Sequence, residues 1–436
     1  MTRKDSFEME TNSIIELYSN GLYQEALNAI FELTRIGCKE AVLFNIEGAC
    51  YANLGQYEMA IESYKKSIAI DPDYSKAHFN LSDSHHQLGN LKDAVKSYKR
   101  SIKIDSNYAE AYNNLGNVFL ELENFDQAAT SFRKALKLKP DYFEAHFGLG
   151  MTLSALGQTE LMITHMNAAV RIKPNLAEAH NKIGLGLEEI GNSQDAIQSF
   201  QDAIKADPNY SEAYNNLANS LRDLGDLKNS ILNYKKAIDI NPDFPVLHHN
   251  LGNVLKDLGR FDDAIASFQN ALKFNIDHAE SHINLGIIFY DTGKLADSVR
   301  SYEKAISLIP DNFDLLNNLG NSLIGLNRFE EAVECFQKSI KLDSTIAATH
   351  SNLGNALAGL NLFDDALKSY HEALKVNSNL PFVHNNLGNI YIKLGDFKAA
   401  IGCFKKAIEI NPSLAQAQRN LENIYKELGS DHIYVE

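Results

Sequence analysis

A period of 34 residues runs through this 436-residue chain without an insertion or a deletion. Repeats begin at residue 7 and at every 34th residue after it, and a half repeat begins at residue 415. We number the positions of each repeat from 1 to 34. Self-similarity at such a period is typical of proteins in which each repeat packs only against its neighbours. The period, rather than the chain length, therefore guides the prediction of domains.

Two apolar stripes recur in each repeat. Position 7 is Leu or Ile in 11 of 13 repeats, position 20 is Ala in nine of 12, and position 24 is Phe or Tyr in ten of 12. Apolar positions 4, 7 and 11, and then 20, 24 and 27, have helical spacing. A frequent Gly at position 15 separates the stripes, and all nine prolines stand at position 32 or position 1, where they can stop or start a helix. The pattern predicts two closely packed helices per repeat and an all-α fold.

The two ends depart from this pattern. Ser13 and Ile14 occupy positions 7 and 8 of the first repeat, and Gln418, Arg419 and Glu422 stand among apolar positions of the last. Terminal repeats need a polar outer face. We therefore predict a tail at 1–6, a degenerate capping repeat at 7–40, an array over 41–414, a capping helix at 415–429 and a tail at 430–436. The repeats of the array start at 41, 75, 109, 143, 177, 211, 245, 279, 313, 347 and 381.

The order of an aromatic residue, L-G, Y, A-x3-F and P resembles the tetratricopeptide repeat (TPR) over residues 7–429. The resemblance implies a right-handed superhelical α-solenoid of about twelve and a half helix-turn-helix repeats. The family's Trp at position 4 is absent. Seven histidines stand there instead, namely His78, His146, His180, His248, His282, His350 and His384. We interpret them as packing residues, because a catalytic residue is needed only once.

Charge and composition exclude several classes of function. The net charge of −15 repels phosphate backbones and anionic lipid. Basic residues occur only as short Lys/Arg pairs near helix ends, so we expect no nucleic-acid binding and no membrane insertion. The start lacks the apolar core of a signal peptide, and the four Cys show no CxxC spacing. We therefore expect a cytoplasmic protein with reduced thiols.

Motifs for catalysis are missing. The sequence contains no G-x-x-x-x-G-K-[ST], no H-E-x-x-H and no G-x-S-x-G. No alternating strand pattern is present that could build a second, catalytic domain. We predict that the chain is not an enzyme and has no catalytic residue, no metal site and no cofactor.

Asparagine recurs inside the first helix, at position 6 in ten of 13 repeats and at position 9 in seven. A spacing of three places both positions on one helix face, away from the apolar stripe. A primary amide offers two donors and an acceptor, so it can pair with a peptide backbone of any sequence. The predicted peptide-binding residues are Asn80, Asn114, Asn117, Asn216, Asn219, Asn250, Asn253, Asn284, Asn318, Asn321, Asn352, Asn355, Asn386 and Asn389. The alternative is that these amides bridge adjacent repeats.

This run resembles the asparagine ladder in the repeat region of O-linked N-acetylglucosamine transferase, whose catalytic domain has no counterpart here. The resemblance implies peptide capture in a concave groove and nothing catalytic. Acidic residues share the predicted groove at positions 2 and 13, namely Glu110, Glu144, Glu178, Glu212, Glu280, Asp314, Glu121, Glu189, Asp223, Asp257 and Asp291. They favour neutral or basic peptides. The row is interrupted by Gly148 and Lys182, at either a side-chain pocket or a packing irregularity that includes Met162 and Met166.

The sequence thus predicts a protein-protein interaction scaffold that binds extended peptide segments in an Asn-lined, acidic concave groove. Two alternatives remain open. The chain could be the substrate-recruiting region of an O-GlcNAc transferase-like or other modifying enzyme whose catalytic domain lies outside it. It could also be a scaffold that assembles from several copies through its end caps or its outer face.

Overall fold

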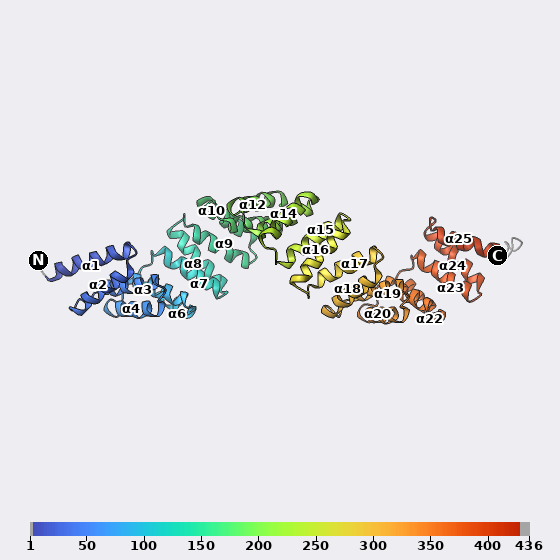
Figure 1. Cartoon of the computed structure of the whole chain (residues 1–436), viewed down its shortest axis with the longest axis horizontal. Helices are drawn as coiled ribbons and strands as arrows, with labels where there is room; N and C mark the ends of the chain where they lie inside the picture. The colour runs from blue at the N-terminus through green and yellow to red at the C-terminus, as the bar shows by residue number, and fades with distance from the viewer. Residues whose placement is uncertain (1–2, 428–436) are drawn as a thin grey trace. The chain divides into compact units, whose positions relative to one another are not determined.

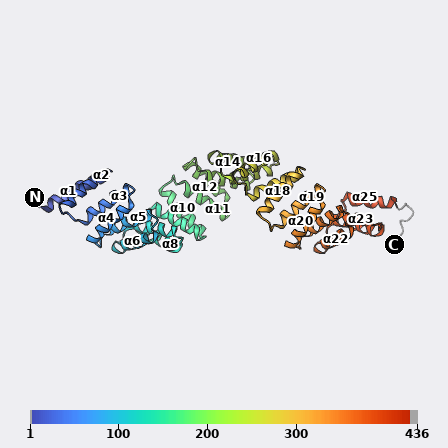
Figure 2. The same cartoon turned by 60° about the horizontal axis from the view of Figure 1, so that its bottom comes forward.

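The structure, a computed structural model, describes residues 3–427, with side chains from residue 9 onward. Over this range it contains 25 α-helices, and every regular element is a helix. The chain divides into two compact units, an N-terminal unit over 1–226 and a C-terminal unit over 227–436. Within each unit, every helix packs against the helix before it and the helix after it (Figures 1 and 2). This arrangement confirms the predicted all-α solenoid.

Each repeat consists of a first helix and a second helix. In the N-terminal unit the first helices are α1 (Arg3–Ser19), α3 (Ala41–Asn53), α5 (Ser75–Gln87), α7 (Ala109–Glu121), α9 (Phe143–Ala155), α11 (Ala177–Glu189) and α13 (Ser211–Asp223). Its second helices are α2 (Tyr23–Arg35), α4 (Tyr57–Ile70), α6 (Leu91–Ile104), α8 (Phe125–Leu138), α10 (Thr159–Ile172) and α12 (Ser193–Ala206).

The C-terminal unit continues the alternation. It begins with a second helix and ends with a first helix. Its first helices are α15 (Pro245–Asp257), α17 (Ala279–Asp291), α19 (Phe313–Gly325), α21 (Ala347–Gly359), α23 (Pro381–Lys393) and α25 (Ala415–Glu427). Its second helices are α14 (Leu227–Ile240), α16 (Phe261–Phe274), α18 (Leu295–Leu308), α20 (Phe329–Leu342), α22 (Phe363–Val376) and α24 (Phe397–Ile410).

The helix boundaries follow the repeat positions. From residue 41 onward each first helix begins at position 1 and each second helix at position 17. At the N-terminus α1 begins at Arg3, inside the segment predicted as a tail. At the other end α25 reaches Glu427, and the tail predicted at 430–436 lies outside the described residues. No helix within residues 3–427 is both long enough and apolar enough to cross a membrane.

The turn between the two helices depends on position 15. Nine glycines there have φ between 67° and 82°, the left-handed region in which a Cβ is strained. Three repeats place Glu123, Asn327 or Asn361 at this position, with φ between 55° and 59°. Asparagine tolerates this conformation better than most residues. The glycine predicted to separate the two stripes therefore closes the turn after the first helix.

In eight repeats the core contains an aromatic ring set against a glycine. The rings at position 24 of the second helix are fully buried, as in Phe132, Phe200 and Phe336. A Cβ at the position-8 glycine would lie only 2.5 Å from the ring, as at Gly184 beside Phe200. Because glycine has no side chain, the two helices can approach until the ring touches the backbone. This contact explains why small residues recur at position 8.

Candidate functional site

Six predicted asparagines link consecutive first helices. In each, the position-6 Nδ2 donates a hydrogen bond to an oxygen at position 5 or 9 of the preceding repeat. These bonds are Asn80 to Asn45 (2.9 Å), Asn114 to Asp83 (3.1 Å), Asn216 to Asn181 (3.0 Å), Asn284 to Asn253 (3.0 Å), Asn352 to Asn317 (3.1 Å) and Asn386 to Asn355 (2.9 Å). The interpretation that the amides bridge adjacent repeats is therefore correct for these six.

Position 9 supplies acceptors for the same links. Asn253 and Asn355 each accept a bond from the next repeat, and Asn389 accepts one from Asn420 over 2.9 Å. The Asn355 oxygen also accepts a hydrogen bond of 2.8 Å from the buried hydroxyl of Tyr370. These three amides thus have at least part of their hydrogen-bonding capacity engaged inside the chain.

Position 5 is not part of the predicted set. Four of its asparagines are acceptors, since Asn45, Asn181, Asn317 and Asn385 each receive a bond from position 6 of the next repeat. The sequence signal for such a link is a pair of asparagines 35 residues apart, one repeat plus one residue. A search confined to one position at a time misses this pair.

Three predicted asparagines have no hydrogen bond to their side chains from any residue that the structure describes. They are Asn117 on α7 and Asn318 and Asn321 on α19, and all three are half-buried. Ile283 and Ile287 occupy positions 5 and 9 before Asn318, so that amide has no acceptor to reach. The two remaining predicted residues, Asn219 on α13 and Asn250 on α15, are also half-buried.

The interruption of the row at position 6 of the repeat at 143–176 has a steric cause. A Cβ at Gly148 would lie 2.5 Å from two ring carbons of Phe132, which belongs to the preceding repeat and is fully buried. An asparagine therefore does not fit there. Met162 and Met166 are buried in the core cluster of the N-terminal unit, and Phe147 and Met151 pack against it. The break is thus a packing irregularity of the core.

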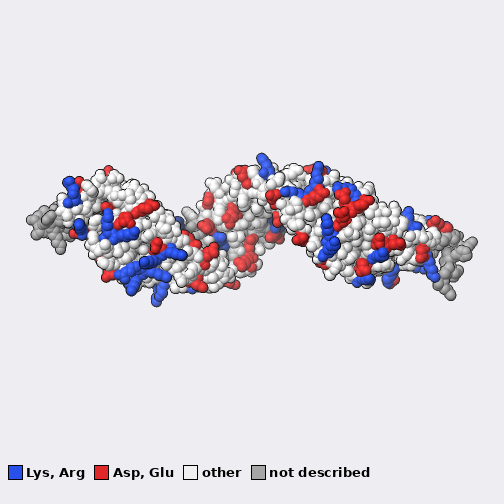
Figure 3. All heavy atoms as spheres, turned by 90° about the horizontal axis from the view of Figure 1, so that it is seen from below, with Lys and Arg blue, Asp and Glu red and all other residues white. Residues whose placement is uncertain are grey.

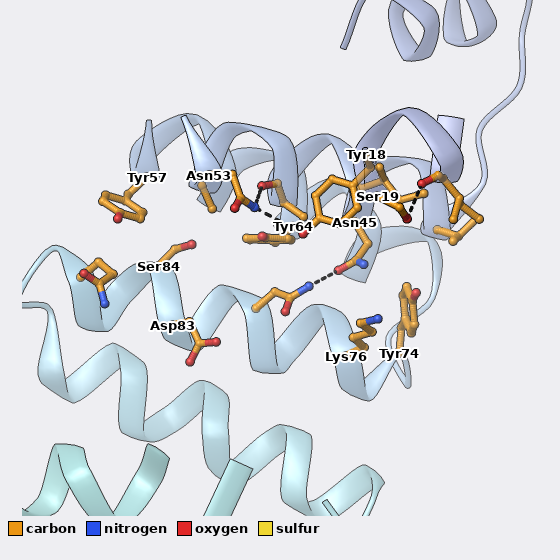
Figure 4. A pocket seen from close by; sticks show the side chains of 17 residues that line it. Tyr18, Ser19, Asn45, Asn53, Tyr57, Tyr64, Tyr74, Lys76, Asp83 and Ser84 are labelled. Atoms are coloured by element: carbon orange, nitrogen blue, oxygen red, sulfur yellow. Dashed lines mark hydrogen bonds between the residues drawn. The ribbon is translucent and has the colours of Figure 1, made fainter. Parts of the chain in front are cut away.

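A cavity of about 460 Å³ opens among α1, α3 and α5 of the N-terminal unit. Four tyrosines contribute to its wall, and Figure 4 shows the ring of Tyr64 near Asn45. The tyrosines are Tyr18, Tyr57, Tyr64 and Tyr74, and the polar lining residues include Asn45, Asn53, Asn80, Asp83, Ser84 and Gln87. Of the predicted binding residues only Asn80 lines this cavity, because the tyrosines come from α1, α4 and a turn that the asparagine pattern does not mark.

Asp83 is the acidic group of this cavity. Its carboxylate accepts hydrogen bonds from the Tyr98 hydroxyl and from Asn114. Burial raises the pKa of Asp83 above its usual range, although both bonds act in the opposite direction. Lys76, which is exposed, lines the cavity as its basic group.

The acidic residues of positions 2 and 13 are exposed. Several of them have partners on neighbouring elements. Glu110 pairs with Lys139 over 3.4 Å, and Glu212 accepts from Asn181 over 3.1 Å. The Glu110–Lys139 ion pair is exposed and therefore weak. All the carboxylates of the set are exposed, so they stay accessible to solvent and to a ligand.

The repeated histidines have a structural role. Nε2 of the position-4 ring lies 2.7–3.0 Å from the carbonyl oxygen of position 32 in the preceding repeat, six residues earlier, in His78, His146, His180, His248, His282 and His350. His384 also forms a hydrogen bond with the backbone of Ser378. A carbonyl only accepts, so Nε2 carries the proton in each ring. The bond ties the turn between repeats to the next helix, and no group of three possible metal ligands occurs in the described part of the chain.

The half-buried His165 makes the stability of the N-terminal unit depend on pH. His165 lies with its Nδ1 3.0 Å from Nδ1 of His146, and burial followed by the charge of His146 lowers the pKa of His165 below 6.5. The folded state therefore binds fewer protons than the unfolded state. The contribution of neutral His165 to stability is present above about pH 6.5 and is lost as the pH falls below that value. We expect the urea midpoint to fall between about pH 7.5 and about pH 5.5.

His165→Gln should reduce this fall, because glutamine stays neutral at both pH values. The matched control is His371→Gln at an exposed position on α22, which should leave the pH dependence unchanged. Equal pH dependence in the wild type and in His165→Gln would show that the His146–His165 contact does not control it.

Comparison with known proteins identifies the repeat. Family profiles described as "TPR repeat" match residues 48–89, 82–123, 218–259, 252–293 and 286–326. Profiles described as "Tetratricopeptide repeat" match residues 109–142, 143–176, 177–210, 199–231, 313–345 and 381–414. A search of curated proteins found no match.

Solved structures of similar proteins include YrrB, described as a TPR protein with an unusual peptide-binding site. It is 26% identical, with 43% of this chain and 97% of YrrB covered and a TM-score of 0.40. The Cut9–Hcn1 hetero-tetramer of the APC/C is 14% identical over 97% of this chain and 96% of the other, with a TM-score of 0.42. Yeast Tom70 is 15% identical, with 98% of this chain and 97% of the Tom70 chain covered and a TM-score of 0.36. On the family profiles and the helix pairs, the chain belongs to the tetratricopeptide repeat family and is a protein-interaction scaffold.

Proposed function

We propose that the chain binds extended peptide segments of partner proteins along the asparagine face of its first helices. The observation that carries this proposal is the group of half-buried amides without a partner among the described residues, Asn117, Asn318 and Asn321. A half-buried amide without a hydrogen bond is costly unless water or a ligand satisfies it. Asn318 and Asn321 are three residues apart on α19, so they present two donor-acceptor groups on one face.

The asparagines that link repeats can take part in the same binding. Each uses one N–H toward the preceding repeat, for example Asn284 toward Asn253. A primary amide has a second N–H and two lone pairs on its oxygen. The link fixes the rotamer of the side chain, so less conformational entropy is lost when a peptide binds. Bridging and peptide binding are therefore compatible in one amide.

The cavity at α1, α3 and α5 supports an anchoring site for one side chain of the peptide. Tyrosine combines a large apolar ring with a polar hydroxyl and is enriched where proteins bind partners. The faces of the rings and the Asp83 carboxylate favour a cationic side chain over an acidic one. Lys76 lines the same cavity and repels a cationic side chain, so the preference for a cation applies only to the part of the cavity away from Lys76. The expected ligand is therefore an extended peptide of neutral or basic character.

The test separates peptide binding from structural support. The probes are peptides selected for binding to the chain from a random phage-displayed library. We expect Asn318→Ala combined with Asn321→Ala to lower the affinity for these peptides by roughly tenfold, since each lost hydrogen bond contributes about 0.5–1.5 kcal/mol. The free energy of unfolding should change by less than about 0.5 kcal/mol. Fluorescence anisotropy and urea denaturation measure the two effects.

The matched control is Asn284→Ala combined with Asn352→Ala, which removes two bonds between repeats. This pair should lower the free energy of unfolding by about 1 kcal/mol for each substitution. Selected peptides that bind the Asn318/Asn321 variant as tightly as the wild type would contradict the proposal. Loss of stability in that variant instead would assign these amides a structural role.

A further inference from the structure

A second cavity lies between the second helices α4 and α6, above the first helix α5. Its volume is about 850 Å³. Figure 3 shows basic side chains gathered on the stretch of the N-terminal unit that α4 to α8 occupy in Figure 1. The cationic residues that line the cavity are Lys65 from α4 and Lys96, Lys99, Arg100 and Lys103 from α6. The prediction that the chain has only scattered basic pairs is wrong here, because two helices bring those pairs together.

Two of these five cations each form an ion pair within the chain. Lys65 donates to Glu62 over 2.8 Å, and Arg100 donates to Asp73 over 2.9 Å. Both pairs are exposed to solvent, so each is weak. The two ion pairs therefore leave the cavity wall with a net positive charge.

The other three cations are available to a ligand. Lys96 and Lys103 form no ion pair with any residue that the structure describes, and Lys99 lies 5.4 Å from the centre of the Phe119 ring. Asp93 is the single acidic residue of the lining. In a chain of net charge −15, this cavity is a local region of positive potential, and such a region attracts and orients an acidic partner.

Part of the lining is apolar, and we call this part the floor. It consists of the half-buried Ile68 and the buried Leu81, and the exposed Ala69 and the rings of His78 and His85 also line the cavity. A nucleic acid or a polyphosphate gains nothing from an aliphatic floor, since its outer surface is charged. A peptide that places a Leu or a Phe between acidic side chains can bury the apolar group and pair the carboxylates at the same time.

The repeat architecture forms a similar cavity in the C-terminal unit, between α20 and α22 above α21, but with a volume of about 340 Å³. The lining uses the same repeat positions. Gln337 takes the place of Lys65, Lys341 that of Ala69, Lys368 that of Lys96 and Glu372 that of Arg100. The groove itself is therefore a consequence of stacking, whereas the excess of positive charge and the larger volume distinguish the cavity between α4 and α6 from this one.

We propose that the cavity between α4 and α6 binds an acidic peptide segment of a partner protein that inserts one apolar side chain between its carboxylates. Lys96, Lys99 and Lys103 pair with the carboxylates, and the floor at Ile68 and Leu81 receives the apolar group. The cations of this surface come from second helices, and its charge preference is opposite to that of the cavity with Asp83. The two surfaces can therefore bind different segments.

The probe is a fluorescein-labelled peptide rich in Glu and Asp with a single central Leu. We expect the full chain to bind it in anisotropy titrations, and binding to weaken as salt rises from about 0.1 M to about 1 M, because the Debye length falls from about 10 Å to about 3 Å. Lys96→Glu combined with Lys103→Glu should weaken binding by roughly tenfold or more. Lys96→Gln combined with Lys103→Gln should give a smaller loss and shows whether charge rather than misfolding is responsible.

The matched control is Lys341→Glu combined with Lys368→Glu, the same change of charge in the equivalent cavity of the C-terminal unit. This control should bind the probe as the wild type does. Equal loss in both charge-reversal variants would overturn the proposal, as would equal binding of a peptide with Ser in place of the Leu. Stronger binding of inorganic polyphosphate or single-stranded oligothymidylate than of the peptide would also overturn it.

Discussion

Replacing Phe132 by alanine should lower the free energy of unfolding of the N-terminal unit by about 3–5 kcal/mol. The ring of Phe132 on α8 is fully buried and touches two glycines, Gly116 of its own repeat and Gly148 of the next. Its removal leaves a cavity that the flat glycine surfaces cannot fill, because the helices on either side are held by further contacts. The loss includes both the transfer free energy of the ring and the cost of the cavity.

The expected effect is local as well as large. Since repeat arrays are stabilised by contacts between neighbours, amide exchange should accelerate most in α7, α8 and α9. Urea denaturation measures the total loss, and hydrogen exchange measured by mass spectrometry locates it. The matched control is Phe31→Ala on α2, whose ring is 65% exposed and should contribute less than about 0.5 kcal/mol. Similar losses in both variants would contradict the assignment of Phe132 to the core.

Replacing Gly148 by asparagine should destabilise the chain by about 1–3 kcal/mol. On sequence grounds the opposite is expected, since asparagine stands at this position in ten of 13 repeats and is the better helix former. It would also offer a hydrogen-bond donor to Asn117. The structure reverses the expectation, because a Cβ at residue 148 would lie 2.5 Å from the ring of Phe132, which is fully buried.

The control for this substitution is Gly402→Asn on α24, where nothing lies within 4 Å of an added Cβ. That variant should match the wild type or exceed it slightly in urea midpoint. Adding Phe132→Leu to Gly148→Asn should recover part of the loss, because a smaller side chain makes room at residue 148. A Gly148→Asn chain as stable as the wild type would show that the ring adjusts more easily than its packing indicates.

The helices and the core followed from the repeat pattern alone. Apolar spacing predicted both helices of each repeat, and the aromatic position 24 is the buried ring in the structure, as in Phe268 and Phe336. These features are local, because a helical stripe and a turn glycine are encoded within about 20 residues of one another. The same pattern identified the family. The capping role of the two end repeats and the acidic character of the groove depend on which residues face solvent, and both stay predictions from the sequence.

The candidate site was predicted less completely. The asparagine face was identified, but the division between Asn284, which links two repeats, and Asn318, which has no described partner, was not. That division depends on the residues at positions 5 and 9 of the adjacent helix. The tyrosines around the cavity at α1, α3 and α5 were missed for the same reason, since separate elements contribute them.

The sequence by itself determined the period, the presence of two helices in each repeat and the residues of the core, because each of these follows from spacing within one repeat. The tertiary structure alone decided which amides are engaged, why residue 148 is glycine, and where Lys65 and Lys96 meet around one cavity. The physical reason is the stacking of repeats. Hydrogen bonds, ring contacts and charges act over a few ångströms, and stacking brings within that distance residues that lie about 30 positions apart in the chain.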